Sequence, residues 1–312
     1  MDTDCKQLPS SLQVIIKRIK RYRQKMNSQL VTAIINCAKV NEEELEEWND
    51  YNHPVRDSYG RKLVYKENFF ELMVMSWVEG DFSAIHDHGC TQWGAVQVFG
   101  EAEHAIFSLE SDFLTISSCQ KVDPGTILPV DGDLIHQMGN RTKTKFLSLH
   151  VYGLFTPSGS NNESVTGNAR IFNVTEGCIE RTNGGVFYGL PQTQINAIKL
   201  GLQSDYISWL RNTTEYIQRI QKVNQHESTK ASEVIEKKIG QLFFDIKHWQ
   251  SLQQEVKLCL NKDGEVIKPR HFQLLHSEIR KLLNLVGRAE GVAAVYNAID
   301  SLNLLDYPAS KT

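Results

Sequence analysis

Two histidines in the first third of the chain have the spacing of a metal-binding pair. His86 and His88 lie two positions apart within residues 80–100. The alternation of Met73, Met75 and Trp77 before the pair and the run over residues 95–99 after it predict extended structure here. Because side chains of an extended segment alternate between its two faces, both imidazoles would point to the same side. Two imidazoles fixed on one rigid face are half of a mononuclear metal site, although such a pair alone is more often incidental or structural.

A third histidine, His136, follows 50 positions after the first and is preceded by a turn-rich segment that contains Gly125 and Gly132. An apolar run over residues 146–152 comes next. A small antiparallel barrel brings residues at this separation onto one inner wall. Three neutral histidines would leave about half of the positions of an octahedral metal open for a substrate and for oxygen. Three buried barrel histidines that hold no metal are the alternative interpretation.

The composition is that of an ordinary globular protein with enough residues for a large core. Of the 312 residues, 41% are hydrophobic and 23% are charged, and the formal net charge is −3. This balance gives no indication of a nucleic-acid or membrane partner. The six cysteines include no CxxC pair, and the sequence shows no secretory or membrane-spanning run. We therefore expect reduced thiols and a cytoplasmic protein.

The N-terminal part of the chain, residues 1–191, combines helical and extended patterns. Apolar residues at helical spacing predict helices within residues 10–50, the first of them capped at Ser10–Ser11. Short runs separated by turns predict an all-β barrel over residues 59–191, with closing strands at 169–174 and 185–188.

The pattern becomes helical again after the barrel. Ile195, Ile198 and Leu202 begin a series of apolar residues at steps of three and four, which predicts an all-α domain over residues 192–312. This domain would cover the mouth of the barrel, form a homodimer interface or contact a carrier protein, and the sequence leaves these alternatives open.

Two segments resemble the motifs of the cupin superfamily, whose fold is a double-stranded β-helix barrel. The matching residues are Gly80, His86, His88 and Gly100 of the first motif and Gly125, His136 and Asn140 of the second. Trp93 stands where the first motif usually has a glutamate, and Asp131 replaces the proline of the second. The resemblance therefore implies a site of three histidines rather than three histidines and a carboxylate.

A cupin site that lacks the glutamate is similar to that of the thiol dioxygenases, and of cysteine dioxygenase in particular. Tyr59-Gly-Arg61 precedes the metal motif by the interval of that family, and Ser148-Leu-His150-Val-Tyr152 matches its Ser-x-His-x-Tyr relay. The family uses Fe(II) to add both atoms of O2 to a thiol sulfur. The resemblance thus implies a small-molecule thiol substrate, most simply L-cysteine, which would become cysteine sulfinate.

This resemblance covers approximately residues 8–191 and implies a metal site and a substrate site. The implied Fe(II) ligands are His86, His88 and His136. Arg61 would bind the substrate carboxylate through two parallel hydrogen bonds, supported by Tyr59, whereas an ordinary surface arginine is the alternative. Trp93 falls at the position of the cysteine that some family members cross-link to the relay tyrosine. It would narrow the substrate pocket, and no cross-link is expected.

The relay motif supplies the remaining functional side chains. Tyr152 would place its phenol beside the metal, oriented by His150, with Ser148 hydrogen-bonded behind His150. Spacing by two puts all three residues on one face of a strand, as such a relay requires. A buried but inert row of the same residues is the alternative.

Three functional hypotheses stay open at this point. The first is an Fe(II)-dependent thiol dioxygenase that acts on L-cysteine. The second keeps the iron but assigns a different or larger thiol in a specialised pathway. The third is a non-catalytic cupin that serves as a binding or sensor module. The complete set of histidines and the relay row count against this third hypothesis.

Overall fold

The computed structural model describes residues 8–54, 57–155, 165–188, 192–205, 207–212, 214–215 and 218–219. The chain divides into two units, Met1–Gln203 and Ser204–Thr312. Only a few helical residues, beginning at 207, are described in the second unit. The predicted all-α domain therefore lies largely outside the described residues, and its limits at 192–312 stay a prediction.

The predicted N-terminal helices are present. The helical elements are α1 (Ser10–Tyr22), η2 (Arg23–Lys25), α2 (Ser28–Ala38), η3 (Glu43–Trp48) and η4 (Gln192–Gln194). Helix α1 buries one apolar stripe, made of Leu12, Ile15, Ile16 and Ile19, because residues three and four apart share a helix face.

The start of α1 differs from the prediction, because no side chain caps this helix. Ser11 instead donates a hydrogen bond to Glu44 Oε2 at 2.8 Å and so ties α1 to η3. Helix α2 does have a side-chain cap, since Asn27 Oδ1 accepts a hydrogen bond from the backbone N–H of Leu30 at 2.8 Å.

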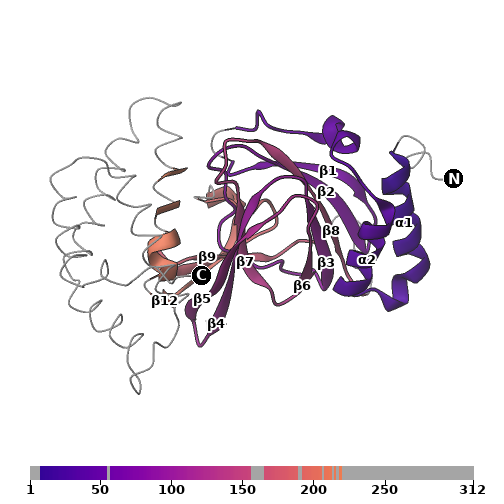
Figure 1. The fold of residues 1–312 in the computed structure, drawn as a ribbon. Helices are drawn as coiled ribbons and strands as arrows, with labels where there is room; N and C mark the ends of the chain where they lie inside the picture. The colour runs from indigo at the N-terminus through magenta and orange to yellow at the C-terminus, as the bar shows by residue number, and fades with distance from the viewer. Residues whose placement is uncertain are drawn as a thin grey trace, which may run out of the picture. The chain divides into compact units, whose positions relative to one another are not determined.

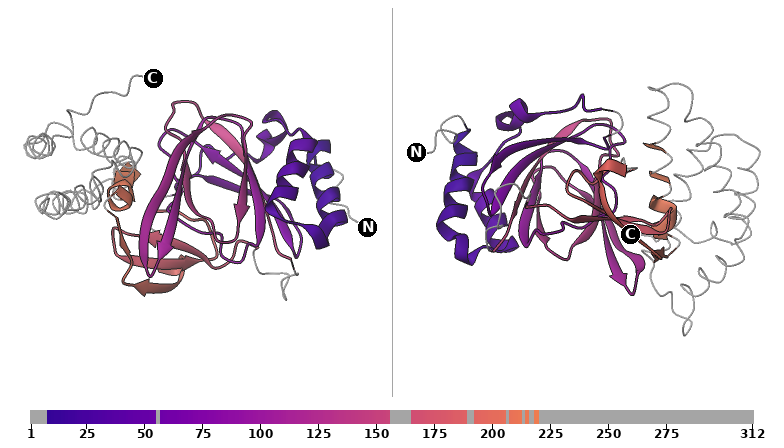
Figure 2. Two further views of the ribbon diagram at one scale, coloured as in Figure 1. Left: turned by 60° about the horizontal axis from the view of Figure 1, so that its bottom comes forward. Right: turned by 180° about the vertical axis from the view of Figure 1, so that it is seen from behind.

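The described strands form three antiparallel sheets (Figure 1). Their bounds are β1 (Gly60–Lys66), β2 (Phe70–Trp77), β3 (Trp93–Val98), β4 (Ala102–Glu110), β5 (Phe113–Val122), β6 (Ile127–Asp131), β7 (Ile135–Gly139), β8 (Phe146–Gly153), β9 (Ala169–Asn173), β10 (Cys178–Thr182), β11 (Ile195–Leu200) and β12 (Gln203–Ser204). The strand orders are β1-β2-β8-β3-β6, β12-β5-β4-β7 and β11-β10-β9. The predicted all-β barrel with N-terminal helices is thus confirmed, and the two larger sheets form its walls (Figure 2).

Strand β8 separates the apolar core from the interior of the barrel. Its residues Leu147, Leu149 and Val151 are fully buried in one core cluster with the apolar stripe of α1 and residues of α2. Figure 1 shows both helices against the outer face of this sheet. Because strand side chains alternate, the residues between them, Ser148 to Tyr152 in steps of two, face the barrel interior.

Two predicted elements are wrong. Residues 195–200 form strand β11 and not a helix, because their backbone pairs with β10 from Cys178↔Leu200 to Thr182↔Ile195. The helical spacing of a few apolar residues was too short a signal to outweigh this pairing. Residues 185–188 form no strand, whereas the closing strand predicted at 169–174 is present as β9.

Among the described residues, none of the helices has the length and apolar character that crossing a membrane would need.

Candidate metal centre

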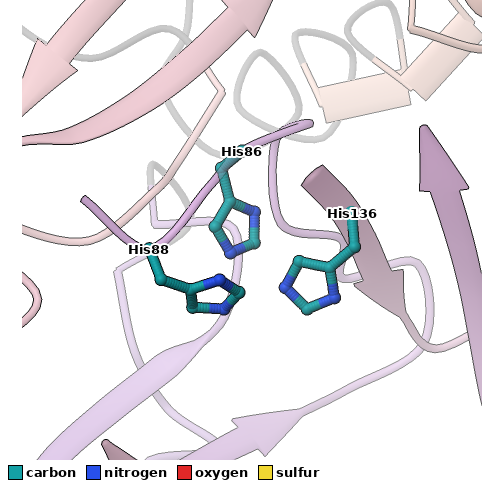
Figure 3. Close-up of side chains that lie close together, drawn as sticks. All are labelled: His86, His88 and His136. Carbon is teal, nitrogen blue, oxygen red and sulfur yellow. The ribbon is translucent and has the colours of Figure 1, made fainter. Parts of the chain in front are cut away.

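His86, His88 and His136 converge inside the barrel. One nitrogen of each ring lies within 4.8 Å of the corresponding nitrogens of the other two, and all three side chains are buried. Figure 3 shows the three imidazole rings turned toward a common point. Their ring centroids are 4.6–5.3 Å apart, a spacing at which one ion could contact all three nitrogens.

The hydrogen bonds of these rings leave nitrogens available for a metal. His86 donates from Nδ1 to the carbonyl of Ala84 at 2.8 Å, which leaves its Nε2 as a free lone pair. His136 uses Nδ1 in a hydrogen bond with His104, and its buried Nε2 has no partner among the described residues. Neither nitrogen of His88 forms a hydrogen bond of ordinary geometry, although the Leu134 backbone lies close to the ring. Buried polar atoms without partners are costly, so this donor set fits a bound metal.

The backbone fixes the spacing between the loop histidine and the strand histidine. His86 lies in no regular strand, but it forms an isolated bridge to His136 of β7, with both N–H groups donating to the opposite carbonyl at 2.9 Å. The predicted extended backbone at this position is therefore present as a bridge instead of a full strand.

The residue between the two loop histidines anchors the loop. Asp87 is buried and accepts hydrogen bonds from the backbone N–H of Gly89 at 3.0 Å and of Arg170 at 2.8 Å. Its second oxygen pairs with the Arg170 guanidinium at 2.5 Å. Gly89 has φ +56° and an added Cβ would lie 2.1 Å from the carbonyl oxygen of Gly167, so only glycine fits this turn.

Burial keeps the three imidazoles neutral. It lowers the pKa of His86 to about 4. Burial, followed by the nearby histidines, also holds the pKa values of His88 and His136 well below the ordinary value. A neutral ring presents a lone pair instead of a proton, so the triad is ready to bind a cation near neutral pH.

The predicted relay residues form one continuous hydrogen-bonded row on β8. The Tyr152 hydroxyl is 2.8 Å from His150 Nδ1, and the Ser148 hydroxyl is 2.8 Å from His150 Nε2. Behind them, Trp77 donates from Nε1 to the Ser148 hydroxyl oxygen at 2.8 Å. All of these side chains are buried.

The indole at the end of this row favours one direction for its protons. Trp77 Nε1 can only donate, so Ser148, having accepted that bond, can donate its own proton to His150 Nε2. His150 then carries its proton on Nδ1 and donates it to the oxygen of Tyr152. This order leaves the Tyr152 O–H to donate into the pocket, and burial raises the pKa of this phenol, so it stays protonated.

A pocket of about 320 Å³, including its open mouth, lies beside the triad. Its lining residues are Tyr59, Arg61, Met73, Met75, His86, Asp87, His88, Tyr152, Thr166, Ala169, Gly184 and Val186. The structure thus brings the predicted substrate residues Tyr59 and Arg61 together with two of the predicted metal ligands and the relay tyrosine.

Arg61 belongs to a hydrogen-bonded chain in this pocket that the sequence did not indicate. Its Nη2 donates to Thr166 Oγ1 at 3.4 Å, and Thr166 donates onward to the buried carboxylate of Glu71 at 3.0 Å. Tyr59 lies in the wall, where its hydroxyl accepts from the Val186 N–H at 3.1 Å. Arg61 is therefore an oriented pocket side chain and not an ordinary surface arginine.

Trp93 does not lie in the pocket, and its predicted place there is corrected. Its fully buried indole lies in the core cluster with α1 and α2, where an added Cβ on Gly153 would touch its ring. The neighbouring Gly94 pairs with Tyr152 across the sheet, and an added Cβ there would lie 2.6 Å from the Tyr152 ring. Strand alternation therefore places Gly94, not Trp93, against the relay tyrosine. No cysteine lines the pocket among the described residues.

The stability of the metal-free protein should fall in acid because of His150. Burial, and then the charge of Arg61, lowers its pKa to about 3, whereas the unfolded chain has an ordinary value near 6.5. Between these two values the unfolded state binds a proton that the folded state does not. The contribution of a neutral His150 to the free energy of unfolding is therefore fully present above pH 6.5 and is lost as the pH falls toward about 3. We expect the His150→Gln variant to have a shallower decline of unfolding free energy in that window, by about 1.4 kcal/mol per pH unit. Denaturant unfolding at several pH values measures this slope, and parallel curves for the two proteins would contradict the prediction.

The sequence pattern of the family described as cysteine dioxygenase type I matches residues 3–157 of this chain. Among solved structures, the protein TT1209 from Thermus thermophilus is similar over 35% of this chain and 93% of its own, at 14% identity and a TM-score of 0.29. A conserved protein with a double-stranded β-helix domain from Klebsiella pneumoniae matches over 36% of this chain and 84% of its own, at 18% identity and a TM-score of 0.30. A cupin-2 domain protein from Rhodospirillum rubrum matches over 34% and 66%, at 17% identity and a TM-score of 0.26.

Proposed function

The chain belongs, through residues 3–157, to the cysteine dioxygenase type I family, and on that premise we propose that it is an Fe(II)-dependent dioxygenase that converts L-cysteine to cysteine sulfinate. The observation that carries the proposal is the buried triad of His86, His88 and His136 beside a pocket that also holds Arg61 and Tyr152. A thiol dioxygenase needs an open metal site, a substrate anchor and a proton donor, and this pocket offers side chains suited to each.

Iron is the metal that best suits this donor set and this reaction. His86, His88 and His136 would hold it through neutral nitrogens and leave coordination positions open, as in other non-heme iron sites. Fe(II), when bound, supplies the electrons that oxygen chemistry requires, which Zn²⁺ cannot do.

The charge of the pocket favours a thiol that carries a carboxylate. Arg61 can form two parallel, charge-assisted hydrogen bonds to a planar carboxylate. Thr166 accepts a hydrogen bond from the guanidinium and is itself held by Glu71, which lowers the cost of ordering Arg61 when the substrate binds. The thiol and O2 combine with both oxygen atoms on sulfur, so the reaction balances without an external reductant.

The relay would hold one proton at the hydroxyl of Tyr152. His150 fixes the direction of that hydroxyl, and Ser148 and Trp77 fix the ring of His150. The phenol can then donate a hydrogen bond to an acceptor atom of the substrate, or to an oxygen atom derived from O2, in the pocket. The sulfur itself needs no dedicated base, because metal binding lowers the pKa of a thiol.

The proposal is tested by anaerobic reconstitution with Fe(II), followed by oxygen uptake with L-cysteine and mass analysis of the product. We expect oxygen consumption that matches the amount of cysteine sulfinate formed. Iron binding without turnover of cysteine would overturn the cysteine assignment and favour a different or larger thiol. A protein that binds no iron would overturn the enzyme assignment and favour a non-catalytic cupin.

Removal of one hydroxyl should separate the relay from metal binding. We expect Tyr152→Phe to bind Fe(II) as the wild type does, because Tyr152 is not one of the three ligands. Its kcat should fall by about 10²-fold or more, since a positioned proton donor typically contributes 10²–10⁴-fold. Iron content and steady-state oxygen uptake measure the two quantities, and an unchanged kcat would identify the row as inert.

The setting that we propose for this reaction is the cytoplasm, where the free cysteines among the described residues would remain reduced. The partners required are the thiol and O2. The homodimer or carrier-protein contact expected for the C-terminal helices stays a proposal, because most of residues 192–312 lie outside the described residues.

A further inference from the structure

A fourth buried histidine contacts the triad. His104, on strand β4, places Nε2 2.7 Å from Nδ1 of His136, and the two rings meet edge to face at 76° with centroids 5.0 Å apart. Strand β4 pairs with β7, where Ile106 lies opposite His136 and His104 lies opposite Met138. His104 and His136 are therefore diagonal neighbours on one face of the sheet, which is the arrangement that lets two rings meet.

The hydrogen bond between these rings has a direction that matters for metal binding. If Nε2 of His104 donated, a neutral His136 would carry its own proton on Nε2, the nitrogen that has no other described partner. That proton would occupy the lone pair that a metal needs. If His136 donates from Nδ1 instead, its Nε2 is free to bind. When Nε2 of His104 accepts this hydrogen bond, His136 is therefore in the tautomer that can bind a metal.

The first histidine of the triad is oriented differently. His86 donates from Nδ1 to a backbone carbonyl, that of Ala84, which no side-chain substitution removes. For His136, the hydrogen-bond partner of Nδ1 is a side chain, that of His104. Outer partners of this kind typically change metal affinity by 10–100-fold when they are lost.

We propose that His104 is a positioning residue for the metal site, which acts by accepting the Nδ1 proton of His136 and fixing the orientation of that ring. The inference rests on the proposed metal site and adds to it a residue outside the ligand triad. His104 is not among the residues that line the substrate pocket, so its effect should appear first in metal affinity.

The test compares His104→Leu, which removes the acceptor, with His104→Gln, whose amide oxygen can accept the same proton. The matched control is His53→Gln. His53 is also buried, but it donates from Nδ1 to the Asp50 carbonyl at 2.8 Å and lies 3.3 Å from an Asp81 oxygen instead of contacting a ligand histidine. Affinity is measured on the full chain by anaerobic competition for Fe(II) with a chromogenic chelator. The melting temperature of each metal-free variant reports any general loss of stability.

We expect His104→Leu to bind Fe(II) about 10–100-fold more weakly than the wild type, with His104→Gln restoring most of the loss and His53→Gln leaving affinity unchanged. Equal Fe(II) affinity in the wild type and His104→Leu would overturn the role of His104 while leaving the metal site intact. Equal weakening in His104→Leu and His104→Gln would also overturn it, because the acceptor would then be irrelevant. A wild-type protein that binds no Fe(II) would overturn the metal site itself.

Discussion

Replacement of His86 by alanine is expected to abolish both Fe(II) binding and oxygen consumption with L-cysteine. The substitution removes one of the three nitrogen donors that the described residues offer, and also the hydrogen bond that His86 forms with the Ala84 carbonyl. Loss of a direct ligand should cost more than the roughly 10–100-fold in affinity that the loss of an outer partner costs. Iron content after reconstitution and desalting measures the binding, and an oxygen electrode measures the turnover.

The control for this variant must change a buried histidine without touching the site. His53→Gln meets that condition, because His53 is bonded to Asp50 and Asp81 at the end of the N-terminal helical segment. It should retain iron and activity. Full iron content in His86→Ala would show that the triad is not the metal site, and the three histidines would then be ordinary barrel residues.

The second large effect is expected from Arg61→Ala, and it should depend on the substrate. For L-cysteine, loss of hydrogen bonds to a charged group costs about 1.5–3 kcal/mol, so kcat/KM should fall on the order of 10- to 100-fold. Cysteamine has the same thiol and amine but no carboxylate, so its kcat/KM should change little. Steady-state oxygen uptake measures kcat/KM for both thiols, and the ratio of the two values shows the discrimination. The iron content should equal that of the wild type.

A second variant tests whether the hydrogen bond to Thr166 is needed to position the guanidinium of Arg61. Thr166→Val keeps the shape of the side chain but removes the hydroxyl that lies between Arg61 and Glu71. It should weaken discrimination between L-cysteine and cysteamine in the same direction as Arg61→Ala, but by a smaller factor. Equal losses for the two substrates in Arg61→Ala would show that Arg61 supports the fold of the pocket and does not bind a carboxylate.

Much of this site could be predicted from residue types and their spacing. His86, His88 and His136 lie within motifs of a known order, and the period of two along residues 148–152 was enough to place the relay on one strand face. The apolar stripe of α1 likewise identified a helix whose buried face the structure confirms. These features are local, or they are repeated at intervals that backbone geometry sets.

Other features depended on which strands are neighbours. Trp93 and Gly94 differ by one position, and only the pairing of β3 with β8 shows which of them faces Tyr152. Residues 195–200 have a short helical pattern of apolar residues but form strand β11, because the hydrogen bonds to β10 outweigh the spacing of a few side chains.

The chain's own sequence determined the chemistry that is available, namely three imidazoles, a guanidinium and a Ser-x-His-x-Tyr row. Only the tertiary structure decided how these groups are oriented. His104 contacts His136. Thr166 bonds to Arg61, 105 positions away, and to Glu71, 95 positions away. No local periodicity encodes such contacts, since they arise when strand pairing and loop closure bring distant side chains within hydrogen-bonding distance.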